Sequence, residues 1–462
     1  MTLIKSISGI RGTIGGKPQE NLTPLDATQF AAAYAQWLRK RNSEEQNLRV
    51  VIGRDARPSG PLLQALVQNT LLAAGIDVID LELATTPTVE MAVVRHKAQG
   101  GIILTASHNP VEWNALKLLD EQGEFIDAQA GAALLKMIEQ ANFSFAPVHE
   151  LGQYQRHETA LEEHIEAILA LPYVRHEAIR KAGFKVAVDG VHSVGGLAIP
   201  ALLEALGVEV ERLYCEPTGQ FPHNPEPLAA HLQDIMKTVP EKGCDLGVVV
   251  DPDVDRLAFI TEEGAMFGEE YTLVAAADYL LKEQKGPLVS NLSSSRALRD
   301  LATQNGVAYH ASAVGEVNVV ARMKEVNALI GGEGNGGVIL PDLHYGRDAL
   351  VGVALVLSHL AEGRPKLSAL KARYPAYYMA KNKAQLTPGR DVDSLLDRVA
   401  RENSHADINT EDGVKIDYAD SWVHLRKSNT EPIIRIYTEA RSAEEAERLA
   451  SQFTRQLEAA AR

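Results

Sequence analysis

The sequence predicts an α/β protein in which three similar mixed α/β domains precede a C-terminal α+β domain. Two observations predict the first part: a pattern of strand, helix, strand, helix and strand occurs three times, and each occurrence ends in a polar loop. Strands that alternate with helices form right-handed crossovers and a largely parallel sheet, whose functional loops lie beyond the C-terminal ends of the strands. A third observation, a change of pattern near residue 377, predicts the last domain.

The three repeats contain apolar runs and helical runs in the same order. Their closing strands and loops are GGIILTASHNP, DLGVVVDPDVDR and NALIGGEGNGG. In each repeat the order is first strand, helix, next strand, and closing strand with its loop. These segments are 49–53, 61–75, 76–83 and 100–110 in the first repeat. They are 184–190, a helix after 196, 208–216 and 245–256 in the second, and 287–295, 296–306, 307–313 and 327–337 in the third. All three closing loops are therefore expected at the ends of strands.

The C-terminal part has a different pattern of apolar and polar residues. Residues 412–428 show rough period-2 alternation and predict a hairpin, residues 433–440 predict another strand, and residues 442–462 predict an amphipathic helix with an acidic start. The predicted domains are 1–150 with the TASHNP loop, 151–255 with the DPDVDR loop, 256–372 with the GGEGNGG loop and 373–462 with the RKSNTEP loop.

Composition restricts the class of protein. The chain has 462 residues, 46 Lys and Arg against 61 Asp and Glu, and a net charge of −15, so its long-range field repels nucleic acid. A negatively charged substrate would need a local group of Arg and Lys. Two cysteines exclude a disulfide scaffold and, with no signal sequence at the start, predict the cytoplasm. The longest apolar run, 349–357, is about half of the ~20 residues that cross a bilayer, so no membrane span is expected.

The segment DPDVDR at residues 251–256 is a candidate metal site. Asp251, Asp253 and Asp255 are two positions apart, and in an extended chain this spacing points all three carboxylates the same way. Clustered carboxylates repel one another without a cation, and oxygen ligands suit Mg²⁺. The segment lacks the glycine and glutamate of an EF-hand. The alternative is a solvated acidic turn.

The segment TASHNP places Ser107 on the turn after an apolar strand, where backbone N–H groups and a cation would stabilise a phosphate. Ser107 is the candidate nucleophile, and an ordinary turn is the alternative. His108 is a weaker candidate, because a lone histidine is more often packed or capping than a base. Lys117 is one polar residue in an apolar, strand-like run, which indicates an amine in a cleft or, alternatively, a snorkelling lysine. Because no GxSxG is present, a hydrolase triad is disfavoured.

The segment GGEGNGG matches neither common nucleotide-binding pattern. Glu333 would repel an anion, so a carboxylate beside the amide of Asn335 suits sugar hydroxyls better than phosphate, and a plain glycine turn is the alternative.

Two arginine-containing regions are candidate anion sites. RKSNTEP at residues 426–432, with Arg435 after it, offers guanidinium, hydroxyl and amide groups for a phosphate, and an exposed hairpin turn is the alternative. Arg11, Arg54 and Arg57 add positive charge near the amino end, or form structural ion pairs only.

Taken together and in this order, the four loops resemble the active-site loops of the α-D-phosphohexomutase family. The similarity spans the whole chain, and SGIRG at 8–12 and FPHNPEP at 221–227 are similar to further family segments. The resemblance implies a heart-shaped arrangement of four domains around one cleft, the first three sharing a mixed α/β architecture.

The resemblance also implies roles for the matching residues. Ser107 would be the phosphoserine, Arg11 and Lys117 would match the acid/base region, and Arg256 would support the metal loop. The candidate catalytic residues are Ser107, Lys117, Arg11, His108 and Arg256; the Mg²⁺ ligands would be Ser107 through a phosphoryl oxygen, Asp251, Asp253 and Asp255. The substrate residues would be Glu333 and Asn335 at the sugar, and Arg426, Ser428, Asn429, Thr430 and Arg435 at the phosphate that does not react.

The implied reaction moves phosphate between O6 and O1 of a hexose phosphate, through phosphoserine and a 1,6-bisphosphate that also serves as activator. GEGNGG with SNTEP looks most like the archaeal-type phosphoglucosamine mutase branch, which implies glucosamine 6-phosphate as substrate. A phosphoglucomutase/phosphomannomutase of broad specificity is the alternative, because Asn335 and Gly337 stand where the family loop usually has Ser and His. A Mg²⁺-dependent sugar phosphatase and a non-catalytic sugar-phosphate sensor are remoter alternatives. The expected partner is a small sugar phosphate, bound by a monomer or a homodimer.

Overall fold

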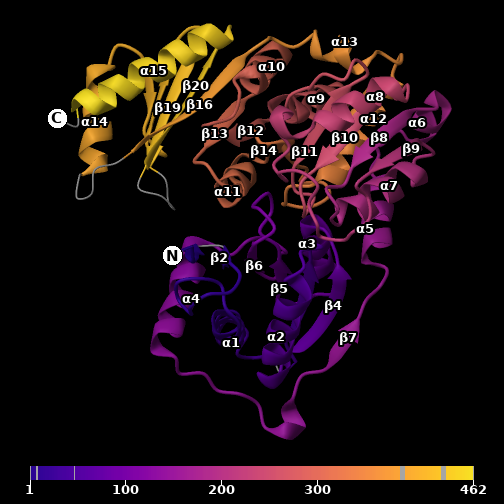
Figure 1. Cartoon of the computed structure of the whole chain (residues 1–462), viewed down its shortest axis with the longest axis vertical. Coiled ribbons are helices and arrows are strands. Elements are labelled where there is room, and N and C mark those ends of the chain that lie inside the picture. Colours follow the sequence, from indigo (N-terminus) through magenta and orange to yellow (C-terminus); the bar gives the residue numbers. More distant parts are fainter. Residues whose placement is uncertain (1, 7–8, 46, 386–390, 428–432, 461–462) are drawn as a thin grey trace. The chain divides into compact units, whose positions relative to one another are not determined.

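Figure 1 shows the computed structural model of the chain, which describes residues 2–6, 9–45, 47–385, 391–427 and 433–460. The chain divides into two compact units. The first consists of residues 1–283 with 335–369, and the second of residues 284–334 with 370–462. The domain boundaries expected at 150, 255 and 372 stay predictions.

The first unit contains a seven-stranded sheet in the order β1-β2-β6-β5-β3-β4-β7. β3, β4, β5 and β7 are parallel, whereas β6 is antiparallel to both β5 and β2. Ile102 and Leu104 of β5 pack into the core on one face and Ile103 into the core on the other, because successive strand side chains point to opposite faces. The elements are β1 (Ile4–Ser6), β2 (Gly9–Thr13), α1 (Pro24–Arg41), β3 (Arg49–Arg54), α2 (Gly60–Ala73), β4 (Asp77–Leu83), α3 (Thr86–Arg95), β5 (Gly100–Leu104), β6 (Trp113–Leu119), α4 (Ala128–Gln140) and β7 (Tyr154–Arg156).

The same unit contains a second sheet, in the order β11-β10-β8-β9, in which only β11 is antiparallel. The buried helix α12 contains the apolar run 349–357. Among the described residues, no helix is both long enough and apolar enough to cross a membrane. The elements are α5 (Ala160–Leu169), α6 (His176–Ala182), β8 (Lys185–Asp189), α7 (Gly195–Ala205), β9 (Glu209–Leu213), α8 (Gln233–Glu241), β10 (Leu246–Val250), β11 (Leu257–Thr261), α9 (Glu269–Glu283), β15 (Gly337–Ile339) and α12 (Ala349–Ala361).

The second unit combines the third repeat with the C-terminal part. Strand β12 pairs in parallel with β13 and β14. The C-terminal sheet is antiparallel in the order β16-β20-β19-β18-β17, and α15 lies across it in Figure 1 (yellow). The elements are β12 (Leu288–Asn291), α10 (Ala297–Asn305), β13 (Tyr309–Ser312), α11 (Glu316–Val326), β14 (Ile330–Glu333), β16 (Tyr378–Gln385), α14 (Val392–Glu402), β17 (Asp407–Asn409), β18 (Val414–Asp417), β19 (Trp422–Lys427), β20 (Ile433–Ala440) and α15 (Ala443–Ala460), while α13 (Leu367–Lys371) spans the change of unit.

The predicted fold class is confirmed: three α/β repeats precede an α+β part, and each closing loop follows the strand that the sequence predicts. The predicted repeat left out one strand, which follows each closing loop as β6, β11 or β15. β6 and β11 pair antiparallel with the strand before their loop. The Ser107 loop and the DPDVDR loop are therefore connections between two adjacent, buried strands.

A buried cluster of ionisable side chains joins α3, α5 and the start of α12. Asp348 Oδ2 lies 2.9 Å from His164 Nε2 and 3.3 Å from His344 Nε2, and His344 Nδ1 lies 3.4 Å from Glu90 Oε2. Burial opposes a charge on His344, but the hydrogen bonds to Asp348 and Glu90 outweigh burial and raise the pKa of His344 to about 10. His344 is therefore a cation in the folded protein.

We expect His344→Gln to destabilise the protein by about 3 kcal/mol below pH 6.5, because it breaks a buried ion pair. The folded pKa is raised, so this stabilisation is complete below the ordinary pKa of 6.5 and is lost as the pH rises through about 10. Urea unfolding at both ends of this range, with the exposed His176→Gln as control, measures the difference. A destabilisation that stays the same at both pH values would contradict the assignment.

Candidate active site

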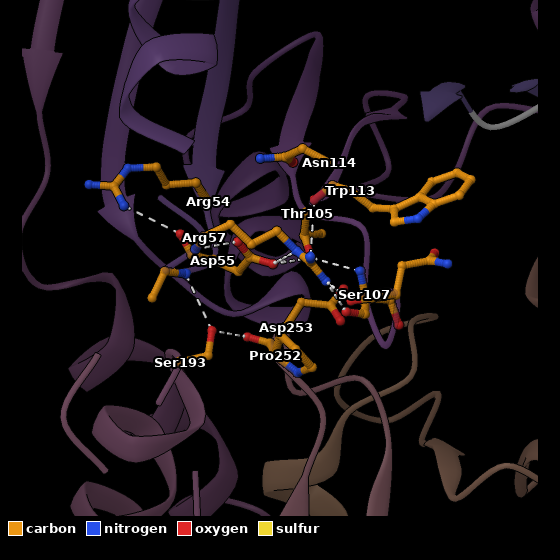
Figure 2. Close-up of polar contacts among 12 residues, drawn as sticks. Arg54, Asp55, Arg57, Thr105, Ser107, Trp113, Asn114, Ser193, Pro252 and Asp253 are labelled. Atoms are coloured by element: carbon orange, nitrogen blue, oxygen red, sulfur yellow. Dashed lines mark hydrogen bonds and ion pairs between the residues drawn. The ribbon is translucent and has the colours of Figure 1, made fainter. Parts of the chain in front are cut away.

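The turn after β5 holds Ser107 in the left-handed region, with a φ of +48°. The Ser107 N–H donates to Thr105 Oγ1 at 3.0 Å, and the Thr105 hydroxyl donates to Asp55 Oδ2 at 2.7 Å. A left-handed φ is unfavourable for a residue with a Cβ and persists only when surrounding contacts impose it. Figure 2 shows the side chains of Thr105 and Asp55 close to Ser107.

Arg57 supplies the strongest of those contacts. It is fully buried and pairs with Asp55, with Nε 3.0 Å from Oδ2. Its Nη2 donates to the carbonyls of Ser107 and Asn109 at 2.6 Å each, and its Nη1 donates to the carbonyl of Trp113 at 3.0 Å (Figure 2). Of the two interpretations of Arg57, the structural ion pair is therefore the right one. Its guanidinium group holds Asp55 and the Ser107 loop rather than a ligand.

Asp251, Asp253 and Asp255 follow β10, and their carboxylates lie within 4.8 Å of one another. The expectation of an extended chain is wrong, because the segment is a turn in which Val254 has a φ of +65°. All three side chains are fully buried, so the alternative of a solvated acidic turn is also wrong. The three carboxylates therefore come together because the chain turns, and not because alternate side chains of a strand point the same way.

Tertiary contacts bring the predicted nucleophile and the predicted amine to this acidic cluster. Ser107 Oγ donates to Asp251 Oδ2 at 2.7 Å. Lys117 Nζ lies 2.7 Å from Asp253 Oδ2 and 3.4 Å from Asp255 Oδ2. Burial opposes the charge of Lys117, yet the two carboxylates raise its pKa above the usual value. Lys117 is thus an ammonium ion held in the site, not a snorkelling lysine.

Two residues that the sequence analysis missed complete the contacts. Arg347 Nη2 donates to Asp255 Oδ2 at 2.6 Å, and the Thr86 hydroxyl at the start of α3 donates to Asp253 Oδ2 at 2.7 Å. One signal for Arg347 was available, because the string GRDA occurs twice, at 53–56 and at 346–349. Thr86 had no such signal.

The acidic cluster fits a divalent cation. Asp253 Oδ1 and Asp255 Oδ1 are buried and have no hydrogen-bond partner among the described residues. Burial, followed by repulsion from Asp255 and Asp253, raises the pKa of Asp251 well above its usual range. A hard divalent ion would accept both oxygens as ligands, and its positive charge would offset the repulsion between the carboxylates. An all-oxygen donor set is the kind that Mg²⁺ takes.

Arg11 and Arg256 also lie at this site. Arg11 Nη1 donates to Asn109 Oδ1 of the Ser107 loop at 3.3 Å. The Arg256 N–H donates to Asp251 Oδ1 at 3.1 Å, so its backbone supports the metal loop. Burial and the charge of Arg256 lower the pKa of Arg11, which shows that the two guanidinium groups act on each other. A concentration of positive charge of this kind favours an incoming phosphate.

His108 lies beside the nucleophile, with Nδ1 3.2 Å from Ser107 Oγ. Burial and the charge of Arg256 lower the pKa of His108 well below its usual value. The imidazole is therefore neutral at pH 7. Its contact with Ser107 places it in the site, and its role stays a prediction.

The predicted sugar and phosphate residues lie in different parts of the chain. Glu333 ends β14 in the second unit, where Oε1 accepts hydrogen bonds from Asn291 Nδ2 at 2.8 Å and the Gly315 N–H at 3.2 Å. Asn335 belongs to the first unit, and its Oδ1 accepts from the Gly337 N–H at 3.2 Å. Ser428, Asn429 and Thr430 lie outside the described residues.

Arg426 and Arg435 face each other on adjacent strands, β19 and β20. Arg426 Nε lies 3.2 Å from Asp412 Oδ2, an oxygen that also accepts from the Val314 N–H at 3.0 Å. Arg435 lines a hollow of about 780 Å³ whose cations also include Lys381, Lys383 and Arg455. The cations of this hollow, which also contains Glu458, are suited to an anion. Arg426 is not one of its lining residues; its ion pair with Asp412, which the sequence analysis missed, orients it instead.

Comparisons with known proteins agree along the whole chain. Four family models match in order: phosphoglucomutase/phosphomannomutase alpha/beta/alpha domain I at residues 3–145, domain II at 162–264, domain III at 268–377 and the C-terminal domain at 379–456. A phosphoglucomutase/phosphomannomutase of Thermococcus kodakarensis is 38% identical over 94% of this chain and 95% of its own length. A probable phosphoglucosamine mutase of Methanopyrus kandleri is 34% identical over 96% of each chain.

A solved structure is similar over nearly the full length. The phosphoglucomutase/phosphomannomutase family protein of Burkholderia thailandensis is 27% identical, with a TM-score of 0.85 over 99% of this chain and 97% of that one.

Proposed function

The chain belongs to the phosphoglucomutase/phosphomannomutase family, and from that premise we propose its substrate and its reaction cycle. It is a phosphohexomutase, an isomerase that moves phosphate within a sugar phosphate. The comparisons give no support to a sugar phosphatase or a non-catalytic sensor. The proposed reaction converts glucosamine 6-phosphate into glucosamine 1-phosphate.

One observation carries the proposed cycle: Ser107 Oγ lies 2.7 Å from Asp251 Oδ2, in a buried site that also contains the Lys117 ammonium ion. Ser107 carries the phosphoryl group; the sugar hydroxyl forms the new O–P bond as the Oγ–P bond breaks, and the proton of that hydroxyl ends on Ser107 Oγ. The resulting bisphosphate turns over and returns its other phosphate to Ser107. Phosphoryl transfer depends on positioning and charge neutralisation, which Lys117, Arg11 and Arg256 supply here.

We assign Mg²⁺ to Asp251, Asp253, Asp255 and a phosphoryl oxygen on Ser107. When bound, Mg²⁺ neutralises charge on the transferring phosphoryl group. A hexose 1,6-bisphosphate is the proposed activator, because it phosphorylates Ser107 at the start of the cycle. We place the enzyme in the cytoplasm, since Cys215 and Cys244 are both free thiols, as a reducing compartment requires.

Glucosamine phosphate is the first choice of substrate because several relatives with nearly the full length of this chain are named probable phosphoglucosamine mutase. The relative from Thermococcus kodakarensis at 38% identity favours the second candidate, a mutase that accepts glucose and mannose phosphates. Asn335 does not decide between them, because its amide both donates and accepts hydrogen bonds.

The test is kcat/KM for the 6-phosphates of glucosamine, glucose and mannose, with Mg²⁺ and a trace of the matching 1,6-bisphosphate. A strong preference for glucosamine phosphate would support the proposal. Comparable or higher rates with glucose or mannose phosphate would establish the broad mutase instead. Activity that survives complete removal of divalent ions by EDTA would contradict the metal assignment, and release of free phosphate would contradict the mutase cycle.

We expect Arg426→Ala to raise KM for the sugar phosphate about 10-fold or more, with little change in kcat. The lost interaction is a charge-assisted hydrogen bond to the phosphate that does not react, and this bond contributes equally to substrate and transition state. Steady-state kinetics with Arg448→Ala as control would test it, because Arg448 is an exposed arginine paired with Glu445 on α15. A loss of kcat at unchanged KM would contradict the role.

A further inference from the structure

A second group of metal-ligating side chains lies where α3 ends and α5 begins. His96 is the residue that follows α3, His157 directly follows β7, and Glu163 lies in the first turn of α5. Their ligand atoms all lie within 4.8 Å of one another, and all three residues belong to the first compact unit. Each of the three residues is half-buried.

The positions of the ring nitrogens indicate a gap in this group. His157 Nε2 lies 3.2 Å from Glu163 Oε1. The rings of His96 and His157 meet edge to face, with 4.5 Å between their centroids. His96 Nε2 is a buried atom that, within the described ranges, has no hydrogen-bond partner. A buried polar atom without a partner is unfavourable, and a bound ion would supply one.

The surroundings prepare the group for an ion. Arg95 Nε lies 2.8 Å from Glu163 Oε2, and the Thr159 hydroxyl donates to Glu163 Oε1 at 3.0 Å. Such outer contacts orient a carboxylate ligand.

The cluster of His164, His344 and Asp348 is different. There Asp348 Oδ2 lies within hydrogen-bond distance of both imidazoles, and His164 Nδ1 lies 3.0 Å from the hydroxyl of Thr88. This cluster satisfies itself by hydrogen bonds, so its geometry does not call for an ion. In the group of His96, His157 and Glu163, by contrast, His96 Nε2 has no hydrogen-bond partner in the part of the chain that the structure describes and is available to a metal.

We propose that His96, His157 and Glu163 bind a divalent transition-metal ion of the Zn²⁺ class, with water as the remaining ligand. Two imidazoles and one carboxylate form a donor set typical of Zn²⁺, and first-row metals from Co²⁺ to Zn²⁺ bind imidazole well. The site therefore selects a different metal from the all-oxygen cluster of Asp251, Asp253 and Asp255, which suits Mg²⁺.

The bound ion would fasten the end of α3 to the start of α5. The opposite end of α3 contacts the DPDVDR loop, where the Thr86 N–H donates to the Asp253 carbonyl at 2.9 Å. The ion is thus expected to stabilise the fold around α3 rather than to take part in phosphoryl transfer. A ligand that binds only the folded state raises its stability in proportion to ln(1 + [L]/Kd).

The test uses the full-length, untagged and metal-free protein in excess Mg²⁺, titrated with Co²⁺ and then Zn²⁺. We expect one equivalent of Co²⁺ to bind with the visible absorption bands of a low-coordinate nitrogen-ligated site, and Zn²⁺ to displace it. His96→Ala and Glu163→Gln should each weaken binding ~10-fold or more and remove the Zn²⁺-dependent rise in Tm. His176→Ala is the matched control, because His176 lies 3.2 Å from Glu177 on the surface but belongs to no such group.

Binding that is equal in wild type, His96→Ala and Glu163→Gln would overturn the proposal, as would an absence of Co²⁺ binding in excess Mg²⁺. Glu163→Gln keeps the size of the side chain, so it tests the site even if His96→Ala does not fold. Circular dichroism of the metal-free variants separates a lost ligand from a lost fold. None of these outcomes depends on which sugar phosphate the enzyme converts.

Discussion

Ser107→Ala is expected to lower kcat by at least ~10⁴-fold, because in the proposed cycle the phosphoryl group bonds to the Ser107 oxygen in every turnover. The nearest other side-chain hydroxyl of the loop, on Thr105, is fully buried and donates to Asp55. It therefore does not replace Ser107. The variant should fold, since alanine keeps the backbone N–H that donates to Thr105.

The measurement combines steady-state kinetics with intact mass after incubation with a hexose 1,6-bisphosphate. Wild type should gain one phosphoryl group and Ser107→Ala none. Ser59→Ala serves as control, because Ser59 Oγ accepts from Asn114 Nδ2 at 2.9 Å near the same loop but makes no contact with the acidic cluster. Near-normal turnover of Ser107→Ala would refute the covalent cycle.

Arg57→Lys is expected to lower kcat about 100-fold without a comparable change in KM. Lysine keeps the positive charge beside Asp55 but lacks the planar set of donors that Arg57 directs at the carbonyls of Ser107, Asn109 and Trp113. The left-handed turn at Ser107 would then relax, and a displacement of about 1 Å at a reacting group reduces rates by about this factor.

Arg57→Ala should in addition destabilise the protein by about 3–5 kcal/mol, because it leaves the fully buried Asp55 without its counter-ion. Arg41→Ala is the matched control, since its ion pair with Glu121 is exposed and should contribute less than about 1 kcal/mol. Urea unfolding and kinetics on the same samples separate stability from positioning. Wild-type kcat in Arg57→Lys would show that the carbonyl contacts do not position Ser107.

Local pattern predicts a large part of this protein. The alternation of strands and helices, and the polar loops that follow apolar strands, were enough to predict the three repeats and to select Ser107, Asp251, Asp253 and Asp255. Such patterns work because helix and strand periodicity are properties of neighbouring residues. The turn at Val254 was not predicted, since a left-handed residue other than glycine has no clear local signal.

Contacts between distant residues required the tertiary structure. Lys117 reaches Asp253 because β6 folds back antiparallel on β5, and Arg347 reaches Asp255 from a segment 92 positions away. The sequence offered a structural ion pair as one of two readings of Arg57, but it did not show that the partner is Asp55 or that Nη2 holds the carbonyls of the Ser107 loop.

The sequence by itself therefore determined the fold class and the order of the four loops, and it singled out Ser107, the three aspartates and Lys117 as candidates for the chemistry. The tertiary structure alone decided which cations meet which carboxylates, which arginine is structural and which histidines gather at the end of α3. The reason is physical: periodicity and turn preference depend on the local chain, whereas the partner of a buried charge depends on which elements pack against it.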